Sequence, residues 1–255
     1  MPVDDRPASP RGRTSSFRHD GSTLIVEERG AGPHTLLLVH GIGMGRRVFD
    51  DLVERVGPGI RTVVVDLPGY GDSPEPARTP SIERMADTVA ALIRERLRGD
   101  VTVLGHSMGS QVAVEVAARH PRLVDRVVLV APTVNPRERT AARQLLRLAQ
   151  DLAVESPRVL LRGGREYLRA GPNLRRKMRA MLAHRPELAF PRVAAPTLVL
   201  RGEQDYVSPR VWCAQVADDI PDARLVEIPG HGHETMIRDA APAARLIREF
   251  VRGRP

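Results

Sequence analysis

The feature that most restricts the fold of this chain is a short turn between an apolar strand and a helix. Residues 101–104 are an apolar, β-branched run, and residues 111–119 have the composition of a helix. Between them stand Gly105-His106-Ser107-Met108-Gly109. Glycines two residues before and after a serine allow a sharp strand-to-helix turn, because they lack the Cβ atoms that would collide. The pattern predicts an accessible serine hydroxyl, although an idle serine in a glycine-rich turn has the same spacing.

The predicted helix begins directly after Ser107, so the amide of Met108 lies at its positive end. The first amides of a helix have no partner within the helix. Such a donor is suited to an oxyanion that develops on a substrate. Ser107 is therefore the candidate nucleophile, and the Met108 amide is a candidate oxyanion donor.

Two later segments supply the acid and the base that a serine nucleophile requires. The apolar run 198–200 leads into a loop that contains Asp205, and the run 225–228 leads into a loop that contains His233. The order Ser107, Asp205, His233 is the order of the α/β-hydrolase triad, and differs from those of the chymotrypsin and subtilisin types. A hydroxyl needs a neighbouring base, and the imidazole needs a carboxylate to fix its tautomer.

Each of these two assignments has a rival close by. His231 stands two residues before His233, and Glu203 stands two residues before Asp205 on the same loop. The favoured assignment is His233 as the general base and acid, and Asp205 as the acid that orients it.

Five segments resemble motifs of the α/β-hydrolase fold superfamily, from residue 22 to the C-terminus. They are His40-Gly41-Ile42-Gly43, the run 66–73 (DLPGYGDS), Gly105-His106-Ser107-Met108-Gly109, the run 196–205 (PTLVLRGEQD) and the run 229–233 (PGHGH). The chain resembles a serine-nucleophile member of esterase or lipase type with a helical cap. The resemblance implies that the backbone amide of Ile42 is the second oxyanion donor. It also implies supporting roles for His40, Gly41, Gly105 and Gly109, and a structural role for Asp66 and Asp72.

Strand and helix patterns alternate along most of the chain, which predicts an α/β fold with a mostly parallel sheet and helices on both faces. Expected strands are 23–28, 35–39, 62–66, 101–104, 126–130, 197–200 and 224–228; expected helices are 48–55, 81–97, 107–119, 209–219 and 240–251. Ligands bind at the carboxyl ends of strands in such sheets. We expect a loose leader over residues 1–20, a hydrolase core over 21–132 and 191–255, and an inserted helical cap over 133–190.

The expected cap is predicted to contain helices 140–154, 159–168 and 174–184, and it has an excess of positive charge. It contains thirteen Lys or Arg against five Asp or Glu, a surplus equal to the formal net charge of +8 of the whole chain. This surplus either attracts an anionic substrate or forms a solvated arginine-rich surface. The apolar stripes of the cap comprise Leu145, Leu148, Leu152, Leu168, Met178, Met181 and Leu182. Stripe residues that are not buried against the main domain would line the substrate pocket. Because aromatic residues make up only 3% of the chain, we expect this pocket to be aliphatic.

Composition narrows the partners of the protein. No apolar run approaches the length of about 20 residues that spans a bilayer, and residues 1–20 lack the apolar segment of a signal peptide. The single cysteine, Cys213, lies outside every motif and is expected to serve packing. The basic run 175–179 lacks the aromatic residues of a nucleic-acid site. We expect a cytoplasmic enzyme without cofactor, metal, nucleic acid or membrane partner, acting on a small acyl substrate; the pattern leaves the oligomeric state open.

The function that these residues predict is hydrolysis of a small or medium ester, thioester or lactone through an acyl-enzyme. Three alternatives stay open. The same residues serve acyl transfer to an alcohol or amine, and also carbon-carbon bond hydrolysis or perhydrolysis. A ligand-binding protein that has retained the fold and lost turnover is the third.

Overall fold

An eight-stranded sheet forms the middle layer of the structure. The computed structural model describes residues 12–140, 173–233, 235–237 and 239–253, and within them the strands follow the order β1-β2-β4-β3-β5-β6-β7-β8. The strands are β1 (Arg13–His19), β2 (Ser22–Arg29), β3 (His34–Val39), β4 (Ile60–Asp66), β5 (Asp100–His106), β6 (Arg126–Val130), β7 (Thr197–Gly202) and β8 (Ala223–Ile228). The seven expected strands are thus confirmed, with ends that differ by up to two residues.

The six strands from β4 to β8 in this order are parallel, whereas β1 and β2 pair antiparallel. In β3, Leu37 and Val39 face one hydrophobic core, and Leu36 and Leu38 face another. A strand buried on both faces needs apolar residues at every position, which explains the lack of alternation. The expected mostly parallel α/β sheet is confirmed.

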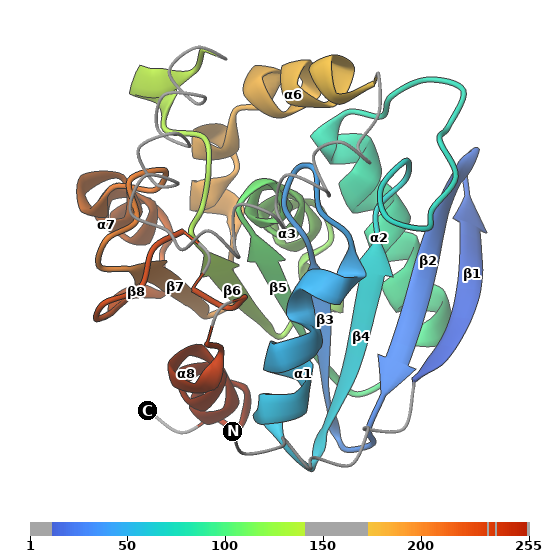
Figure 1. Ribbon diagram of the computed structural model, residues 1–255, viewed down its shortest axis with the longest axis horizontal. Helices are drawn as coiled ribbons and strands as arrows, with labels where there is room; N and C mark the ends of the chain where they lie inside the picture. Colours follow the sequence, from blue (N-terminus) through green and yellow to red (C-terminus); the bar gives the residue numbers. More distant parts are fainter. Residues whose placement is uncertain (1–11, 141–172, 234, 238, 254–255) are drawn as a thin grey trace, which may run out of the picture.

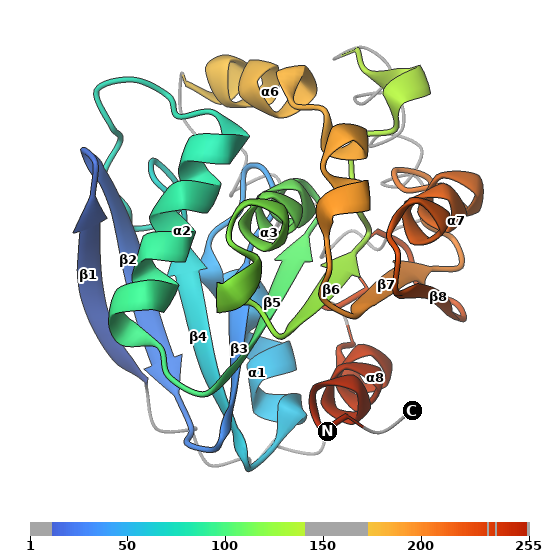
Figure 2. The same ribbon diagram turned by 180° about the vertical axis from the view of Figure 1, so that it is seen from behind.

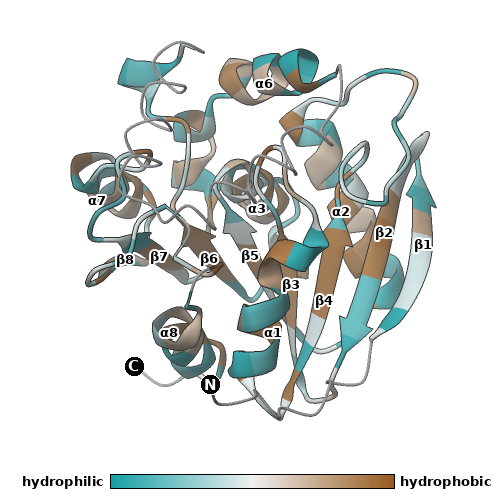
Figure 3. Ribbon diagram, viewed as in Figure 1, coloured by the Kyte–Doolittle hydropathy of each residue, from teal (hydrophilic) through white to brown (hydrophobic). Residues whose placement is uncertain are grey.

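Helices cover both faces of the sheet (Figure 1). On one face lie α1 (Asp50–Val56) and α8 (Ala241–Val251). The other face carries α2 (Ile82–Arg96), α3 (Met108–Arg119) and α7 (Arg210–Asp219), as Figure 2 shows from behind. Figure 3 shows hydrophobic residues along β4 and β6, in contrast to the mainly hydrophilic β1. The two cores are therefore separated by the sheet.

The expected leader is wrong in its second half, because residues 13–19 form β1. This strand pairs with β2 along its whole length, from Arg13 opposite Glu28 to His19 opposite Ser22. Only Phe17 of β1 is buried, and the guanidinium of Arg96 lies 5.0 Å from its ring centroid. A single buried side chain is a weak sequence signal, so the pairing with β2 defines this strand.

Part of the expected cap lies within the described residues. The predicted helix 174–184 is confirmed as α6 (Leu174–Ala183), which lies over the carboxyl ends of the strands, close to α3 (Figures 1 and 2). Its Met181 is buried, with Met178 and Leu182 packed against the same core. The other expected cap helices and the stripe residues Leu145, Leu148, Leu152 and Leu168 fall outside the described residues. Short 3-10 helices join several elements: η1 (Arg46–Phe49), η2 (Pro121–Leu123), η3 (Pro136–Glu138), η4 (Pro186–Leu188) and η5 (Phe190–Arg192).

Candidate active site

Ser107 occupies the turn between β5 and α3 in a backbone conformation that is rare for a residue with a side chain. Its φ angle is 53° and its ψ angle is −118°. A Cβ atom on Gly105 would lie 2.2 Å from the carbonyl oxygen of Gly109, and one on Gly109 would lie 2.2 Å from that of Val39. The two glycines are therefore required by close backbone contacts on either side of the serine. The strain at Ser107 is typical of a functional turn.

The structure brings Ser107, His233 and Asp205 together in a hydrogen-bonded chain. The Nε2 atom of His233 lies 3.1 Å from the Oγ atom of Ser107. The Nδ1 atom of the same ring lies 3.0 Å from Oδ2 of Asp205 and 3.2 Å from its Oδ1. All three side chains are buried. The arrangement lets His233 donate from Nδ1 to the carboxylate while Nε2 accepts the hydroxyl proton.

The loop after β7 fixes the carboxylate of Asp205. The backbone amide of Ser208 donates a 2.7 Å hydrogen bond to Oδ1 of Asp205. The buried guanidinium of Arg201 donates to the carbonyl oxygens of Asp205, at 3.1 Å, and of Ser208, at 3.0 Å. It also pairs with Glu227 on the neighbouring strand. Arg201 thereby braces the backbone of the loop, so Asp205 is held in a single orientation toward His233.

The rivals of Asp205 and His233 point elsewhere. Glu203 is exposed and accepts a 3.1 Å hydrogen bond from the backbone amide of Gly230. The ring nitrogens of His231 face the backbone carbonyl oxygens of Pro229, at 2.9 Å, and Asp239, at 3.3 Å. Glu203 therefore joins the loops after β7 and β8, whereas the ring of His231 contacts only the segment after β8, and neither side chain is hydrogen-bonded to Ser107.

The surroundings of the buried Asp205 and His106 favour different charge states for the two side chains. Burial opposes ionisation of Asp205, yet the contacts with His233 and Ser208 outweigh it and lower the pKa of the carboxyl. Burial and the neighbouring His233 lower the pKa of His106 to about 3. The Nε2 atom of His106 lies 3.1 Å from the carbonyl oxygen of His233, to which the neutral ring donates. The site thus holds an ionised Asp205 beside a neutral His106.

The two expected oxyanion donors lie next to the serine turn. Met108 is the first residue of α3. A Cβ atom on Gly41 would lie 3.1 Å from Cβ of Ser107, so the backbone just before Ile42 passes close to the serine. His40, which is fully buried, accepts a 3.1 Å hydrogen bond from the amide of Leu67 and faces the carbonyl of Gly41 at 2.8 Å. This arrangement fixes the start of the 40–43 turn.

Comparison with known proteins identifies the family of the chain. The model of the alpha/beta hydrolase family matches residues 36–249. The chain belongs to the alpha/beta hydrolase family. This confirms the resemblance carried by the five motif segments.

Two curated relatives match the hydrolase over most of its length. The 2-(acetamidomethylene)succinate hydrolase of Mesorhizobium japonicum is 31% identical and covers 90% of this chain and 91% of its own. The pimeloyl-(acyl-carrier protein) methyl ester esterase of Aromatoleum aromaticum is 31% identical and covers 86% of this chain and 98% of its own. The hydrolase is therefore similar to enzymes named for hydrolysis, including ester hydrolysis.

Solved structures share the fold of the hydrolase at lower sequence identity. An esterase from Exiguobacterium antarcticum has a TM-score of 0.77 and 21% identity, and covers 91% of this chain and 97% of its own. A hydrolase from Oleispira antarctica has a TM-score of 0.79 and 17% identity, and covers 89% of this chain and 94% of its own. These likenesses confirm the α/β-hydrolase fold.

Sequence patterns did not single out three residues that surround the site. Arg201 is an interior strand residue, Tyr70 lies within the 66–73 motif, and Lys177 lies within a basic run. Tyr70 is buried, with its hydroxyl 3.5 Å from Sδ of Met108. Arg201 could have been noticed from the sequence, because it directly follows the apolar run 198–200. A buried strand rarely carries an unpaired cation, so an arginine there indicates a specific partner.

Within the described residues, one group of side chains has the chemistry of metal ligands. Ligand atoms of Glu83, Glu115 and His184 lie within 4.8 Å of one another. His184 follows α6, and its Nε2 atom lies 2.9 Å from Oε1 of Glu115 on α3. This contact connects the end of α6 to the core of the protein.

Two further properties concern the rest of the molecule. Burial raises the pKa of the Cys213 thiol, which lies 3.5 Å from the carbonyl oxygen of Ser208. This position in the core agrees with the expected packing role. Among the helices that the structure describes, none combines the length and the apolar character of a membrane span.

Proposed function

We propose that the hydrolase cleaves small or medium carboxylic esters, thioesters or lactones, with Ser107 as the nucleophile. The observation that carries this proposal is the contact of His233 with both Ser107, at 3.1 Å, and Asp205, at 3.0 Å. The strained conformation of Ser107 supports it, because strain of this kind clusters at functional turns. Similarity to enzymes named as hydrolases and esterases supports the same reaction class.

The first half of the reaction forms an acyl-enzyme. Oγ of Ser107 attacks the carbonyl carbon while Nε2 of His233 takes the hydroxyl proton, and Asp205 stabilises the resulting imidazolium. The carbonyl π electrons move to oxygen, where the amides of Ile42 and Met108 donate hydrogen bonds. Each such donor contributes about 3 kcal/mol in the transition state. The intermediate collapses, and the leaving alcohol or thiol takes the proton from His233.

The second half returns the enzyme to its starting state. Nε2 of His233 takes a proton from a water molecule as its oxygen attacks the acyl carbon. Collapse of the second intermediate breaks the bond to Ser107, which recovers its proton from His233. For each water consumed, an ester or thioester gives one carboxylic acid and one alcohol or thiol, whereas a lactone gives a single hydroxy acid.

The direct test combines Ser107→Ala and His233→Gln with His231→Gln as the matched control. We expect the first two variants to lower kcat on para-nitrophenyl esters by about 10⁶-fold if the three residues act as a unit. His231→Gln leaves kcat within about twofold, because its ring contacts only backbone carbonyls away from Ser107. Activity of Ser107→Ala above about a tenth of the parent value contradicts the nucleophile assignment.

Two further measurements separate the alternatives. A fluorophosphonate probe labels Ser107 in an active hydrolase, and failure to label the folded protein supports a ligand-binding function. Product analysis with an added alcohol or amine separates transfer to that acceptor from hydrolysis by water. Release of free acid in the presence of the acceptor supports the proposed reaction.

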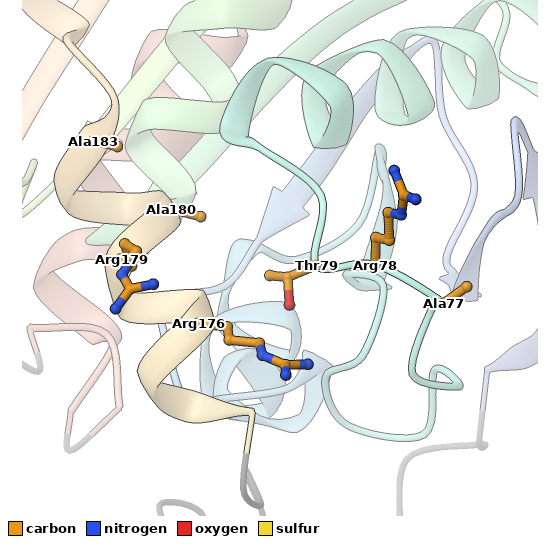
Figure 4. Close-up of a pocket in the computed structure, with 7 residues that line it drawn as sticks. All are labelled: Ala77, Arg78, Thr79, Arg176, Arg179, Ala180 and Ala183. Atoms are coloured by element: carbon orange, nitrogen blue, oxygen red, sulfur yellow. The ribbon is translucent and has the colours of Figure 1, made fainter.

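We further propose that the substrate, or the carrier that presents it, bears an anionic group. A groove with a volume of about 410 Å³ opens between α6 and residues 77–79 (Figure 4). Arg176 and Arg179 line it from α6 and Arg78 from the facing segment. None of these three guanidinium groups forms an ion pair within the part of the chain that the structure describes. The succinate derivative in the name of one relative is also an anion at neutral pH.

A matched pair of substitutions tests this electrostatic attraction. Arg176→Met removes a charge from the groove, and Arg175→Met removes a charge from the exposed part of the same helix outside it. We expect Arg176→Met to lower kcat/KM about fivefold for a succinate half-ester at low ionic strength, and to leave a neutral butyrate ester unchanged. Equal effects of the two substitutions on the half-ester contradict the proposed anion site.

A further inference from the structure

Lys177 is the only lysine of the chain, and its side chain is 2% exposed. Every other long basic side chain is an arginine. Burying an ammonium group is costly unless its charge and its N–H donors have partners. Its surroundings therefore show what this position on α6 does.

Three groups surround the Nζ atom of Lys177, and all come from the 66–75 segment of the core. Nζ donates to the carbonyl oxygen of Gly69 and lies 3.0 Å from Oε2 of Glu75. It also lies 4.5 Å from the ring centroid of Tyr70, within the range of a cation–π interaction. A carbonyl, a carboxylate and an aromatic face around one nitrogen form a site for a compact cation.

The segment is shaped to form this site. Gly69 has a φ angle of 79°, and a Cβ atom there would lie 2.7 Å from Oε2 of Glu75. Its amide donates a 3.0 Å hydrogen bond to the carbonyl of Pro74, which closes the loop. A side chain at residue 69 would displace the carboxylate that Lys177 needs. The glycine therefore permits the approach of the lysine.

The ring of Tyr70 connects Lys177 to the neighbourhood of both proposed oxyanion donors. Tyr70 also contacts the ring of His40, with centroids 5.1 Å apart, and Sδ of Met108, 3.5 Å from its hydroxyl. His40 begins the turn that carries Ile42, and Met108 supplies the other amide. Burial lowers the pKa of His40, and the charge of Lys177 acts in the same direction. The ammonium is thus close enough to influence this turn.

We infer that Lys177 is a positioning residue that attaches the cap helix α6 to Tyr70 and thereby fixes the backbone of the oxyanion donors near Ser107. The inference rests on the proposed function of Ser107, His233 and Asp205. Lys177 itself contacts neither the nucleophile nor the base, so its effect is on the placement of donors. A displacement of about 1 Å at such donors lowers turnover by up to about 100-fold.

The kinetic test compares Lys177→Met with Arg175→Met, which removes the same charge from an exposed position on α6. On a neutral butyrate ester, Lys177→Met is expected to lower kcat by about 10- to 100-fold while KM changes less than about threefold. Arg175→Met leaves both constants unchanged. Equal kcat values for the two variants overturn the inference.

A double-mutant cycle tests the route through Tyr70. If Lys177 acts through this ring, Tyr70→Leu and Lys177→Met have non-additive effects, and the double variant has about the kcat of the more impaired single variant. If the fold-reductions in kcat of the two single variants multiply in the double variant, the inference is overturned. Should Lys177→Met fail to fold by circular dichroism, Glu75→Gln replaces it, because Glu75 is 37% exposed. A kcat about threefold lower at constant KM supports the inference there, and an unchanged kcat overturns it.

The single lysine also permits a measurement that is independent of activity. An amine-reactive acetylating reagent has one ε-amino target in this chain. Mass spectrometry is expected to show Lys177 unmodified in native protein and modified after unfolding in urea; modification at the same rate in both states overturns the inference. The two proposals fail differently. An active Ser107→Ala variant contradicts the proposed function, whereas an inactive Ser107→Ala variant beside an unchanged Lys177→Met variant contradicts only the role of Lys177.

Discussion

Two carboxylates on one loop, separated by a single residue, have different surroundings. Asp205 is 2% exposed and contacts both His233 and the amide of Ser208, whereas Glu203 is exposed and bonds to Gly230. A buried carboxylate orients an imidazole strongly, because water does not compete for its oxygens. The sequence favours Asp205, and the structure adds a physical difference between the two residues, which arises from the backbone of the loop and from Arg201, whose guanidinium donates to its carbonyl oxygens.

At this scale we predict the result of exchanging each carboxylate for its amide. Asp205→Asn is expected to lower kcat by about 10⁴-fold, because an amide at this position stabilises the wrong tautomer of His233. Glu203→Gln removes a charge from the same loop and is expected to change kcat by less than about twofold. Steady-state kinetics on one ester at pH 8 compare the two, and a greater loss in Glu203→Gln assigns the acid to Glu203.

At the scale of elements, the sequence predicts best what one segment determines by itself. The strand, turn and helix around Ser107 follow from apolar runs and two glycines, and all seven expected strands are present. The structure differs where a partner defines an element. β1 has only one buried side chain and depends on its pairing with β2.

The candidate site divides in the same way. The positions of Ser107, Asp205 and His233 at strand ends are predictable, because parallel strands place their carboxyl ends at one edge of the sheet. The contacts of Arg201 and Lys177 are not. Each depends on a side chain reaching a distant segment, Glu227 in one case and residues 69–75 in the other. The hydrophobic periodicity within one segment does not predict a contact with a distant segment.

At the scale of the whole molecule, burial of neutral histidines makes stability depend on pH. The pKa of His106 is lowered to about 3 by burial and by His233, whereas an unfolded histidine has a pKa of about 6.5. Between these values the unfolded chain binds a proton that the native protein does not. Acid therefore favours unfolding over this range. The contribution is fully present above about pH 6.5 and is lost as the pH falls toward 3.

Replacement of His106 by Gln isolates this contribution. We expect the free energy of unfolding of the parent protein to fall by about 1.4 kcal/mol per pH unit more than that of the variant between pH 6 and pH 4.5. His40, whose pKa burial also lowers, is present in both proteins and cancels in the comparison. Urea unfolding at several pH values measures the difference, and parallel pH profiles contradict the charge state assigned to His106.

The residues of the candidate site follow strands that differ in their resistance to local unfolding. Ser107 follows β5, an interior strand, whereas Asp205 and His233 follow β7 and β8, and β8 is an edge strand with mostly half-buried residues. Outer strands open locally at lower free energy than the centre of a sheet. Transient separation of β8 would remove the proposed base, His233, from the proposed nucleophile, Ser107, which stays in place. We therefore expect fraying at this edge to limit the lifetime of the assembled site, and rigidity added along β8 to prolong activity without altering the chemistry of Ser107.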